Sequence, residues 1–220
     1  MLAGRSNAFL LSSGSGQILV DAGRRSRWSL LERRLAELGV DRLDALVLTH
    51  THFDHAENAC RVRTRYQAKV VVQESEARFL ESGDAPLPAG TVLPTRVSTR
   101  RLRRAVQPWF RYPGCPADLV IGDRLDLSTW GFNGFVLHTP GHSRGSMSVV
   151  LDDELALVGD AMFGVIAWSV LPPFADDVGQ LVESWRHLLE TECRVFLPGH
   201  GKAIERRLLE KCFEKRRRRT

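Results

Sequence analysis

The sequence lacks the marks of membrane and exported proteins. The longest apolar runs in its 220 residues are only a few residues long, whereas a membrane-spanning helix needs about 20. The first 17 residues contain one arginine and a four-residue apolar stretch, too short for the core of a secretory signal. We therefore expect a cytoplasmic chain that does not interact with membranes.

Cysteine is scarce, and no two cysteines form a Cys-x-x-Cys pair. The chain has four, at positions 60, 115, 193 and 212. So wide a spacing in a chain without a signal peptide indicates reduced thiols with a structural role rather than a disulfide framework or a thiolate metal site.

Acidic residues are missing from one long segment, although the rest of the chain is rich in them. Residues 85–117 contain six arginines and no acid. The formal net charge of +5 equals the charge of residues 215–219, Lys-Arg-Arg-Arg-Arg, so the remaining chain is neutral. We expect 215–220 to be a solvated basic tail, and binding to nucleic acid is not favoured.

Short apolar runs alternate along residues 1–214 with segments whose apolar residues recur at the period of a helix. We expect these residues to form one domain. Residues 83–117, with six of the ten prolines, are expected to be a loop or lid, with a short basic helix near 98–106. Strands are expected at 8–11, 17–20, 43–48, 69–72, 119–121, 124–127, 134–138, 146–151, 155–158 and 194–197. Helices are expected at 28–38, 56–66, 74–80 and 178–190, and a final helix is expected after residue 201, ending at about 215. This order predicts two sheets packed face to face with helices on both outer faces.

Three of the seven histidines lie within six residues, directly after an apolar strand. They stand in the run Thr-His50-Thr-His52-Phe-Asp54-His55. In an extended segment the side chains of His50 and His52 point the same way and can hold one metal ion. Asp54 and His55 follow at a turn, where they can face a second ion. Imidazole and carboxylate groups are favoured ligands of zinc and similar divalent ions.

This His-x-His-x-Asp-His run resembles the signature of the metallo-β-lactamase superfamily, and four further motifs follow the order of that family. They are Asp21 in Val-Asp-Ala-Gly, His142 in Thr-Pro-Gly-His-Ser-Arg-Gly-Ser, Asp160 in Val-Gly-Asp-Ala-Met-Phe and His200 in Leu-Pro-Gly-His-Gly. The resemblance runs from about residue 8 to residue 203. It implies an α/β fold, a four-layer αββα sandwich with a two-metal site at one edge of the sheets.

The resemblance also implies a role for each motif residue. The first metal ion would be held by His50, His52 and His142, and the second by Asp54, His55 and His200, with Asp160 bridging both. The ions are expected to be zinc, with iron or manganese as alternatives. Asp21 is expected to orient a ligand or a bound water rather than to bind metal.

Two divalent ions a few ångströms apart stabilise a bridging hydroxide near neutral pH and polarise the substrate oxygen. Asp54 is placed to bind metal and to orient the hydroxide. The sequence therefore predicts a metal-dependent hydrolase acting on a small ester, thioester or lactone. A nucleic-acid phosphodiesterase of the same fold and a mononuclear iron enzyme like the persulfide dioxygenases remain as alternatives.

The branches of this family differ at a few motif positions, and these positions indicate which kind of hydrolase the chain resembles. The β-lactamases generally replace the bridging aspartate that Asp160 matches, and the homoserine-lactone lactonases usually carry a tyrosine shortly after it. The flavodiiron proteins have a glutamate where this chain has His52. Gly159–Phe163 is most similar to the thioesterases of the hydroxyacylglutathione hydrolase type. Those enzymes have a helical domain after the last histidine, whereas 20 residues follow His200 here.

Residues 162–174 are apolar and are expected to form either part of the core or a wall of the substrate pocket, with Phe163 and Trp168 as the foremost pocket candidates. Arginines stand at positions 96, 100, 101, 103, 104 and 111. Together the two segments predict a small-molecule substrate with an apolar part and an anionic part.

Overall fold

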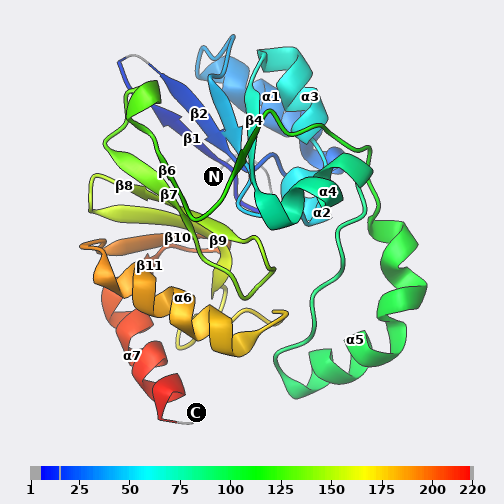
Figure 1. The fold of residues 1–220 in the computed structure, drawn as a ribbon, viewed down its shortest axis with the longest axis vertical. Coiled ribbons are helices and arrows are strands. Elements are labelled where there is room, and N and C mark those ends of the chain that lie inside the picture. Colours follow the sequence, from blue (N-terminus) through cyan, green and yellow to red (C-terminus); the bar gives the residue numbers. More distant parts are fainter. Residues whose placement is uncertain (1–5, 15, 219–220) are drawn as a thin grey trace.

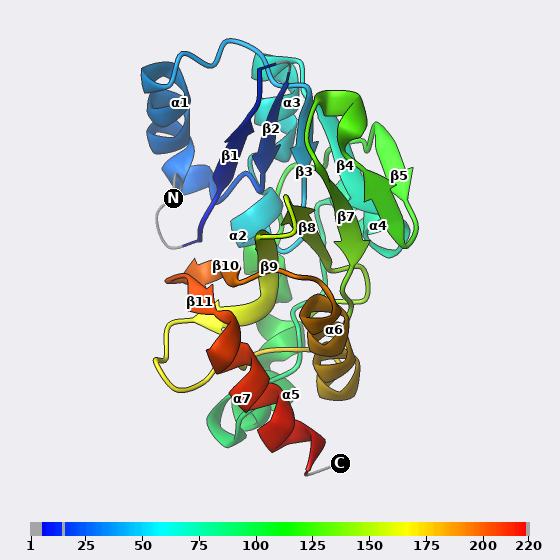
Figure 2. The same ribbon diagram turned by 90° about the vertical axis from the view of Figure 1, so that its left-hand side faces the viewer.

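Two β-sheets form the inner layers of the molecule (Figures 1 and 2). The computed structural model describes residues 6–14 and 16–218. The first sheet has five strands in the order β1-β2-β3-β4-β5. They are β1 (Phe9–Ser12), β2 (Gln17–Val20), β3 (Ala45–Val47), β4 (Lys69–Gln73) and β5 (Leu119–Ile121). β1 and β2 form an antiparallel hairpin, and the other neighbours pair parallel.

The second sheet has six strands in the order β11-β10-β9-β8-β7-β6. They are β6 (Arg124–Asp126), β7 (Gly134–His138), β8 (Met147–Leu151), β9 (Leu155–Gly164), β10 (Val195–Gly201) and β11 (Ile204–Glu205). β9 and β10 pair parallel, and the other neighbours pair antiparallel. Asp152 and Asp153 turn the hairpin between β8 and β9 with φ of 54° and 53°, the left-handed conformation that a type I′ turn requires at both of its central residues.

Helices cover the outer faces of both sheets. On the first sheet lie α1 (Trp28–Glu37), α3 (Ala59–Tyr66) and α4 (Glu74–Ser82), and on the second lie α6 (Val178–Glu190) and α7 (Arg206–Arg217). Figures 1 and 2 show α6 and α7 on the far side of the second sheet from α1 and α3. The predicted four-layer αββα sandwich is confirmed.

Alternation along the strands explains the layers. In β2, Ile18 and Val20 face the core between the sheets, whereas Leu19 faces the core under the helices. In β3, Leu46 points toward the helices while its two neighbours point toward the other sheet. Successive side chains of a strand point to opposite faces, so a continuous apolar run marks a strand that is buried on both faces.

Two segments differ from the sequence-based expectation. Residues 83–117 are not mainly irregular, because α5 spans Leu93–Val106 and a 3-10 helix, η2, follows at Gln107–Phe110. Figure 1 shows α5 standing apart from both sheets. The expected helix at 56–66 is two helices, α2 (Phe53–Ala56) and α3. Asn58 separates them and donates hydrogen bonds to the carbonyls of Ala22, Gly23 and Arg24.

The other differences lie at strand and helix ends. β9 continues to Gly164, so Asp160 lies inside a strand and not after its end as expected. α7 continues through Arg217, so the first residues of the expected basic tail are helical. In the described part of the chain, no helix is long and apolar enough to span a membrane.

Candidate metal centre

Four segments that are distant in sequence bring seven histidine and aspartate side chains to one edge of the two sheets. His50 and His52 follow β3, and Asp54 and His55 lie on α2. His142 lies between β7 and β8, Asp160 in β9 and His200 in β10. Their donor atoms fall into groups, each within 4.8 Å, of His50 with His52 and His142, of Asp54 with His55 and His200, and of His50 with His55 and Asp160.

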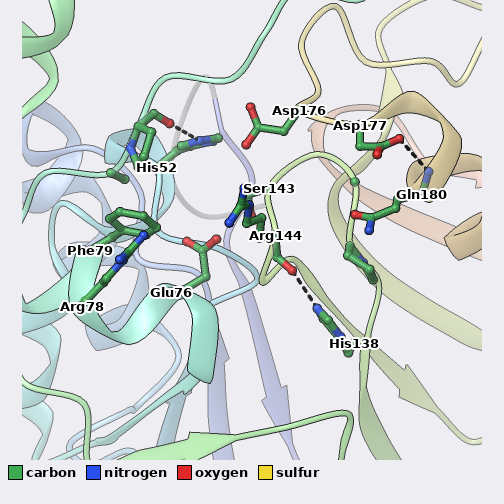
Figure 3. Close-up of a pocket in the computed structure, with 14 residues that line it drawn as sticks. His52, Glu76, Arg78, Phe79, His138, Ser143, Arg144, Asp176, Asp177 and Gln180 are labelled. Carbon is green, nitrogen blue, oxygen red and sulfur yellow. Dashed lines mark hydrogen bonds between the residues drawn. The ribbon is translucent and has the colours of Figure 1, made fainter.

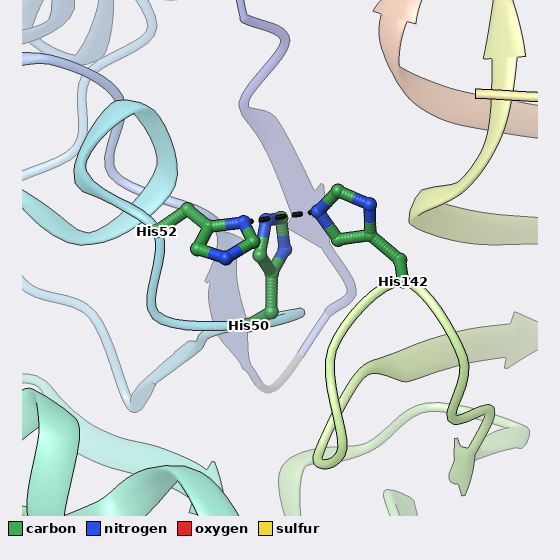
Figure 4. Close-up of side chains that lie close together, drawn as sticks. All are labelled: His50, His52 and His142. Carbon is green, nitrogen blue, oxygen red and sulfur yellow. Dashed lines mark hydrogen bonds between the residues drawn. The ribbon is translucent and has the colours of Figure 1, made fainter. Parts of the chain in front are cut away.

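The first group consists of three buried imidazoles (Figure 4). Nε2 of His142 lies 2.9 Å from Nδ1 of His52, and the ring of His50 lies between 4.6 and 4.7 Å from both rings, centroid to centroid. The outer nitrogens of two rings contact backbone carbonyls, His142 Nδ1 that of Phe174 at 3.0 Å and His52 Nε2 that of Pro86 at 3.1 Å. Such contacts fix the tautomer and aim the remaining nitrogens at a common point.

The second group combines one carboxylate with two imidazoles. Oδ2 of Asp54 lies 3.2 Å from Nε2 of His200, and the facing nitrogens of His55 and His200 are 3.4 Å apart. The ring of Phe163 packs against His200 at 4.8 Å between centroids.

Asp160 lies between the two groups. Its Oδ1 is 3.4 Å from Nε2 of His55, and its Oδ2 is 3.6 Å from Nε2 of both His142 and His200. One carboxylate therefore reaches histidines of both groups, as a bridging ligand must.

Two orphaned polar atoms show that a metal ion fits this centre. Nε2 of His50 and Oδ1 of Asp160 are buried, and neither has a hydrogen-bond partner in the described part of the chain. A buried nitrogen or oxygen without a partner costs about 1–3 kcal/mol. A divalent ion would satisfy both atoms, and nitrogen and oxygen donors at this spacing suit it.

The pKa shifts of the histidines differ between the two groups. Burial lowers the pKa of His50, His52 and His142, that of His142 to about 4, so these imidazoles are neutral and able to bind metal at neutral pH. Burial also opposes charge on His55 and His200, but nearby carboxylates, above all Asp160, outweigh it and raise both pKa values.

Asp21 contacts the centre without joining its ligand groups. Its Oδ2 lies 2.8 Å from Nδ1 of His55, and its carboxylate accepts hydrogen bonds from both the backbone N–H and the hydroxyl of Thr49. The carboxylate thus holds the ring of His55 with Nε2 toward the centre.

Sequence reasoning missed Glu76, which is 2% exposed beside this site. Its carboxylate accepts hydrogen bonds from the backbone N–H and hydroxyl of Thr51, between the first two histidines, and from the backbone N–H of Gly145, near His142. It thereby ties together two ligand-bearing loops. Glu76 lies on an amphipathic helix with other acidic residues, so only its burial distinguishes it.

Two glycines allow the strands to approach the centre. A Cβ on Gly199 would lie 2.5 Å from Oδ1 of Asp160 and 2.6 Å from Cε1 of His55. Gly159 has φ of 49°, and a Cβ there would meet the Thr49 side chain at 2.5 Å. The register of β9 with β10 shifts at this point, opposite Pro198, which lets Asp160 turn toward the metal centre in mid-strand.

An apolar cavity of about 480 Å³ opens beside the ligands. It is bordered by His52, Asp54, His142, Asp160 and His200 and lined by Phe53, Leu87, Pro88, Leu102, Val106, Phe110, Phe163, Pro173 and Phe174. Of the two aromatic candidates for the substrate pocket, Phe163 lines this cavity, whereas Trp168 is 79% exposed and does not line it.

A second cavity, of about 770 Å³, also reaches His52 and is lined by both polar and apolar residues (Figure 3). Arg78, Arg144, Asp176 and Gln180 are among the residues that line it. Of the arginines expected at the substrate, Arg104 lines neither cavity and Arg111 pairs with Asp84 at 2.7 Å. The side chains of Arg96, Ser98, Thr99, Arg100, Arg101 and Arg103 lie outside the described part of the structure.

Comparisons with known proteins agree with this geometry. The family model described as the metallo-beta-lactamase superfamily matches residues 1–200. A probable metallo-hydrolase of Methanocaldococcus jannaschii is 26% identical over 91% of this chain and 90% of its own length. The atrochrysone carboxyl ACP thioesterase of Aspergillus fumigatus is 26% identical over 90% of this chain, which spans 51% of that relative. The solved structure of a metallo-beta-lactamase family protein from Thermus thermophilus matches with a TM-score of 0.69 and 26% identity, covering 97% of this chain and 75% of the other.

Proposed function

The chain belongs to the metallo-beta-lactamase superfamily and is a metal-dependent hydrolase, and from this premise we propose that it uses two divalent ions to hydrolyse a small ester, thioester or lactone. The observation that carries the proposal is the position of Asp160, whose carboxylate lies within 3.6 Å of histidine nitrogens from both ligand groups. A centre for one ion needs no carboxylate shared between two groups.

The proposed ligands of the first ion are His50, His52 and His142, and those of the second are Asp54, His55 and His200, with Asp160 common to both. Zinc is the proposed metal because this mixture of imidazole and carboxylate donors suits it. Ions bound there would supply Lewis acidity, which lowers the pKa of water and polarises a carbonyl oxygen.

The residues of the chain contribute position and proton transfer. Asp54 borders the apolar cavity, and the adjacent His200 keeps its pKa below the usual range despite burial. Asp54 is therefore ionised at neutral pH and can accept a hydrogen bond from the attacking water, which fixes a lone pair toward the substrate carbonyl. Attack forms the new C–O bond, the bond from carbon to the leaving oxygen or sulfur breaks, and the water proton ends on the leaving group.

Two observations favour an acyl substrate over a phosphodiester. One relative, whose match covers 90% of this chain, is named as a thioesterase. This chain spans only about half of that relative's length. Apart from the proposed ligands, every residue that lines the cavity in the described structure is apolar, whereas phosphodiester substrates are held by arginine and lysine.

Metal analysis and a substrate panel test the proposal together. Protein purified without added metal or chelator should contain two divalent ions per chain and hydrolyse members of a panel of thioesters, esters and lactones faster than bis(p-nitrophenyl) phosphate. Asp160→Ala and Asp54→Ala should lower kcat at least about 100-fold while circular dichroism shows a folded chain. Asp123→Asn, on an almost fully exposed side chain, is the control.

Two results would contradict the proposal. A single iron per chain, with activity retained in His200→Ala, would indicate oxygen chemistry on a persulfide. Turnover restricted to the phosphodiester would indicate a nuclease.

A further inference from the structure

We propose that the substrate carries an uncharged hydrocarbon group next to the scissile bond and that the apolar cavity formed with α5 selects it. The inference rests on the proposed hydrolytic function and identifies the substrate class of that site. It concerns the apolar part of the expected substrate.

The composition of the cavity wall carries the argument. Among the side chains that the structure describes, the nine lining residues outside the proposed ligand set are aliphatic, aromatic or proline. Their side chains offer no hydrogen bond, so a carboxylate or phosphate placed there would lose its hydration without compensation. A hydrocarbon group instead gains from leaving water in proportion to its buried area.

The position of the cavity links this selectivity to the reaction. Asp54, Asp160 and His200 border the same space as Phe163 and Phe174. A group that fills the cavity therefore lies directly beside the proposed reaction centre. Its volume of about 480 Å³ is within the range of about 300–1,000 Å³ that small-molecule sites occupy.

Hydrogen bonds at both ends of α5 hold the wall in place. Near its start, the backbone N–H of Thr91 and the hydroxyl of Thr95 donate to the carbonyl of Pro173, each at 2.9 Å. After its end, the Gln107 side chain donates to Asp84 and Ala85 and accepts from the backbone N–H of Leu87. The ring of Phe110 packs on Phe53 of α2 at 4.7 Å between centroids. The cavity is thus preformed. The binding of a substrate should therefore depend on the length of its hydrocarbon group, with no cost for forming the cavity wall.

The same helix supplies a matched pair of variants. Leu102 lines the cavity although it is 54% exposed, whereas Val97 is 48% exposed and does not line it. Both side chains are accessible to water, so replacing either by glutamate leaves the core intact. Only Leu102→Glu places a charge at the cavity.

Turnover of simple esters tests the proposal in the metal-loaded enzyme. With methyl acetate as reference, one series lengthens the acyl group to methyl octanoate and the other lengthens the alcohol to octyl acetate. We expect kcat/KM to rise roughly threefold per methylene in one series, and the series that responds shows on which side of the scissile bond the cavity lies. The eight-carbon ester with a terminal carboxylate should be at least tenfold poorer than its neutral counterpart. In the series that responds, Leu102→Glu should lower the ratio of kcat/KM for the eight-carbon ester to kcat/KM for methyl acetate at least tenfold. Val97→Glu should leave this ratio unchanged.

Binding of octanamide, which has no ester to cleave, separates this proposal from the proposed reaction. Calorimetry should show octanamide binding at least tenfold more tightly than acetamide, and Leu102→Glu but not Val97→Glu should abolish the difference. This pattern without turnover of any ester, thioester or lactone would refute the hydrolytic proposal and keep the cavity assignment. A flat dependence on chain length in both ester series, or equal binding of the two amides, would overturn the assignment.

Discussion

Nδ1 of His55 lies 2.8 Å from Oδ2 of Asp21, and the two residues come from segments 34 positions apart in sequence. Asp21 adopts φ of 61°, a left-handed conformation that aspartate and asparagine tolerate better than most residues. In this position its carboxylate reaches both His55 and Thr49. A residue outside the proposed ligand set thereby sets the orientation of one ligand.

Asp21→Asn should weaken metal binding about 10- to 100-fold. Asparagine accepts the left-handed backbone and keeps one carbonyl oxygen, so the loss reports the missing charge beside His55. Competition against a chelator of known affinity measures the change. Asp123→Asn is the control, and equal affinities in the two variants would show that Asp21 does not support the centre.

Gly199→Ala should empty the centre without unfolding the chain. The added Cβ would stand 2.5 Å from Oδ1 of Asp160 and 2.6 Å from the ring of His55, so Asp160 or His55 must move. We expect less than half the wild-type metal content in the purified variant. Gly122→Ala meets no atom within 4 Å and should retain full metal content. If Gly199→Ala also retained it, the close approach of β10 to the ligands would be refuted.

Glu76→Ala should lower the free energy of unfolding by about 3 kcal/mol. The change leaves the Thr51 backbone N–H and hydroxyl and the Gly145 backbone N–H without their acceptor. Urea denaturation of the metal-free protein measures the loss. Glu74→Ala, at an exposed position of the same helix, should cost less than about 0.5 kcal/mol. Similar losses in the two variants would argue against a special role of the buried carboxylate.

Acid should destabilise the metal-free protein partly through His142. Burial lowers the pKa of this imidazole from 6.5 to about 4, so the unfolded chain binds the proton more tightly than the folded chain. The resulting penalty is absent above pH 6.5, grows as the pH falls, and is complete below pH 4. It amounts to about 3 kcal/mol for this shift.

His142→Gln removes the titrating group and should show the effect by difference. Between pH 6.5 and pH 4 the variant should gain stability relative to the wild type, as measured by urea denaturation in the presence of a chelator. A difference between the two proteins that is constant over this range would show that His142 is not buried in its neutral form.

The sequence predicted the parts of the centre that are continuous along the chain. His50, His52, Asp54 and His55 stand in one run after a strand, and the order of the later motifs indicated His142, Asp160 and His200. The strand positions also followed from the sequence, because apolar runs bounded by turn residues depend mainly on local pattern. The helix boundaries of α1 and α6 agree with the prediction within one residue.

Features that depend on contacts between distant segments could not be predicted in the same way. Phe163 and Trp168 are both aromatic and lie in the same apolar segment, yet Phe163 lines the apolar cavity and Trp168 is exposed. α5 gave only a weak signal because arginines interrupt its apolar positions and Pro94 is its second residue. Glu76 gave none, because its partners Thr51 and Gly145 are 25 and 69 residues away.

By itself, the sequence determined which side chains can bind metal, since donor chemistry and the alternation of side chains along an extended segment are local properties. It also determined the two-sheet architecture through the spacing of buried strands. Only the tertiary structure decided that Asp160 reaches both histidine groups and that the cavity beside them is apolar. These features depend on the register of β9 against β10 and on where α5 packs, and contacts between distant residues set both.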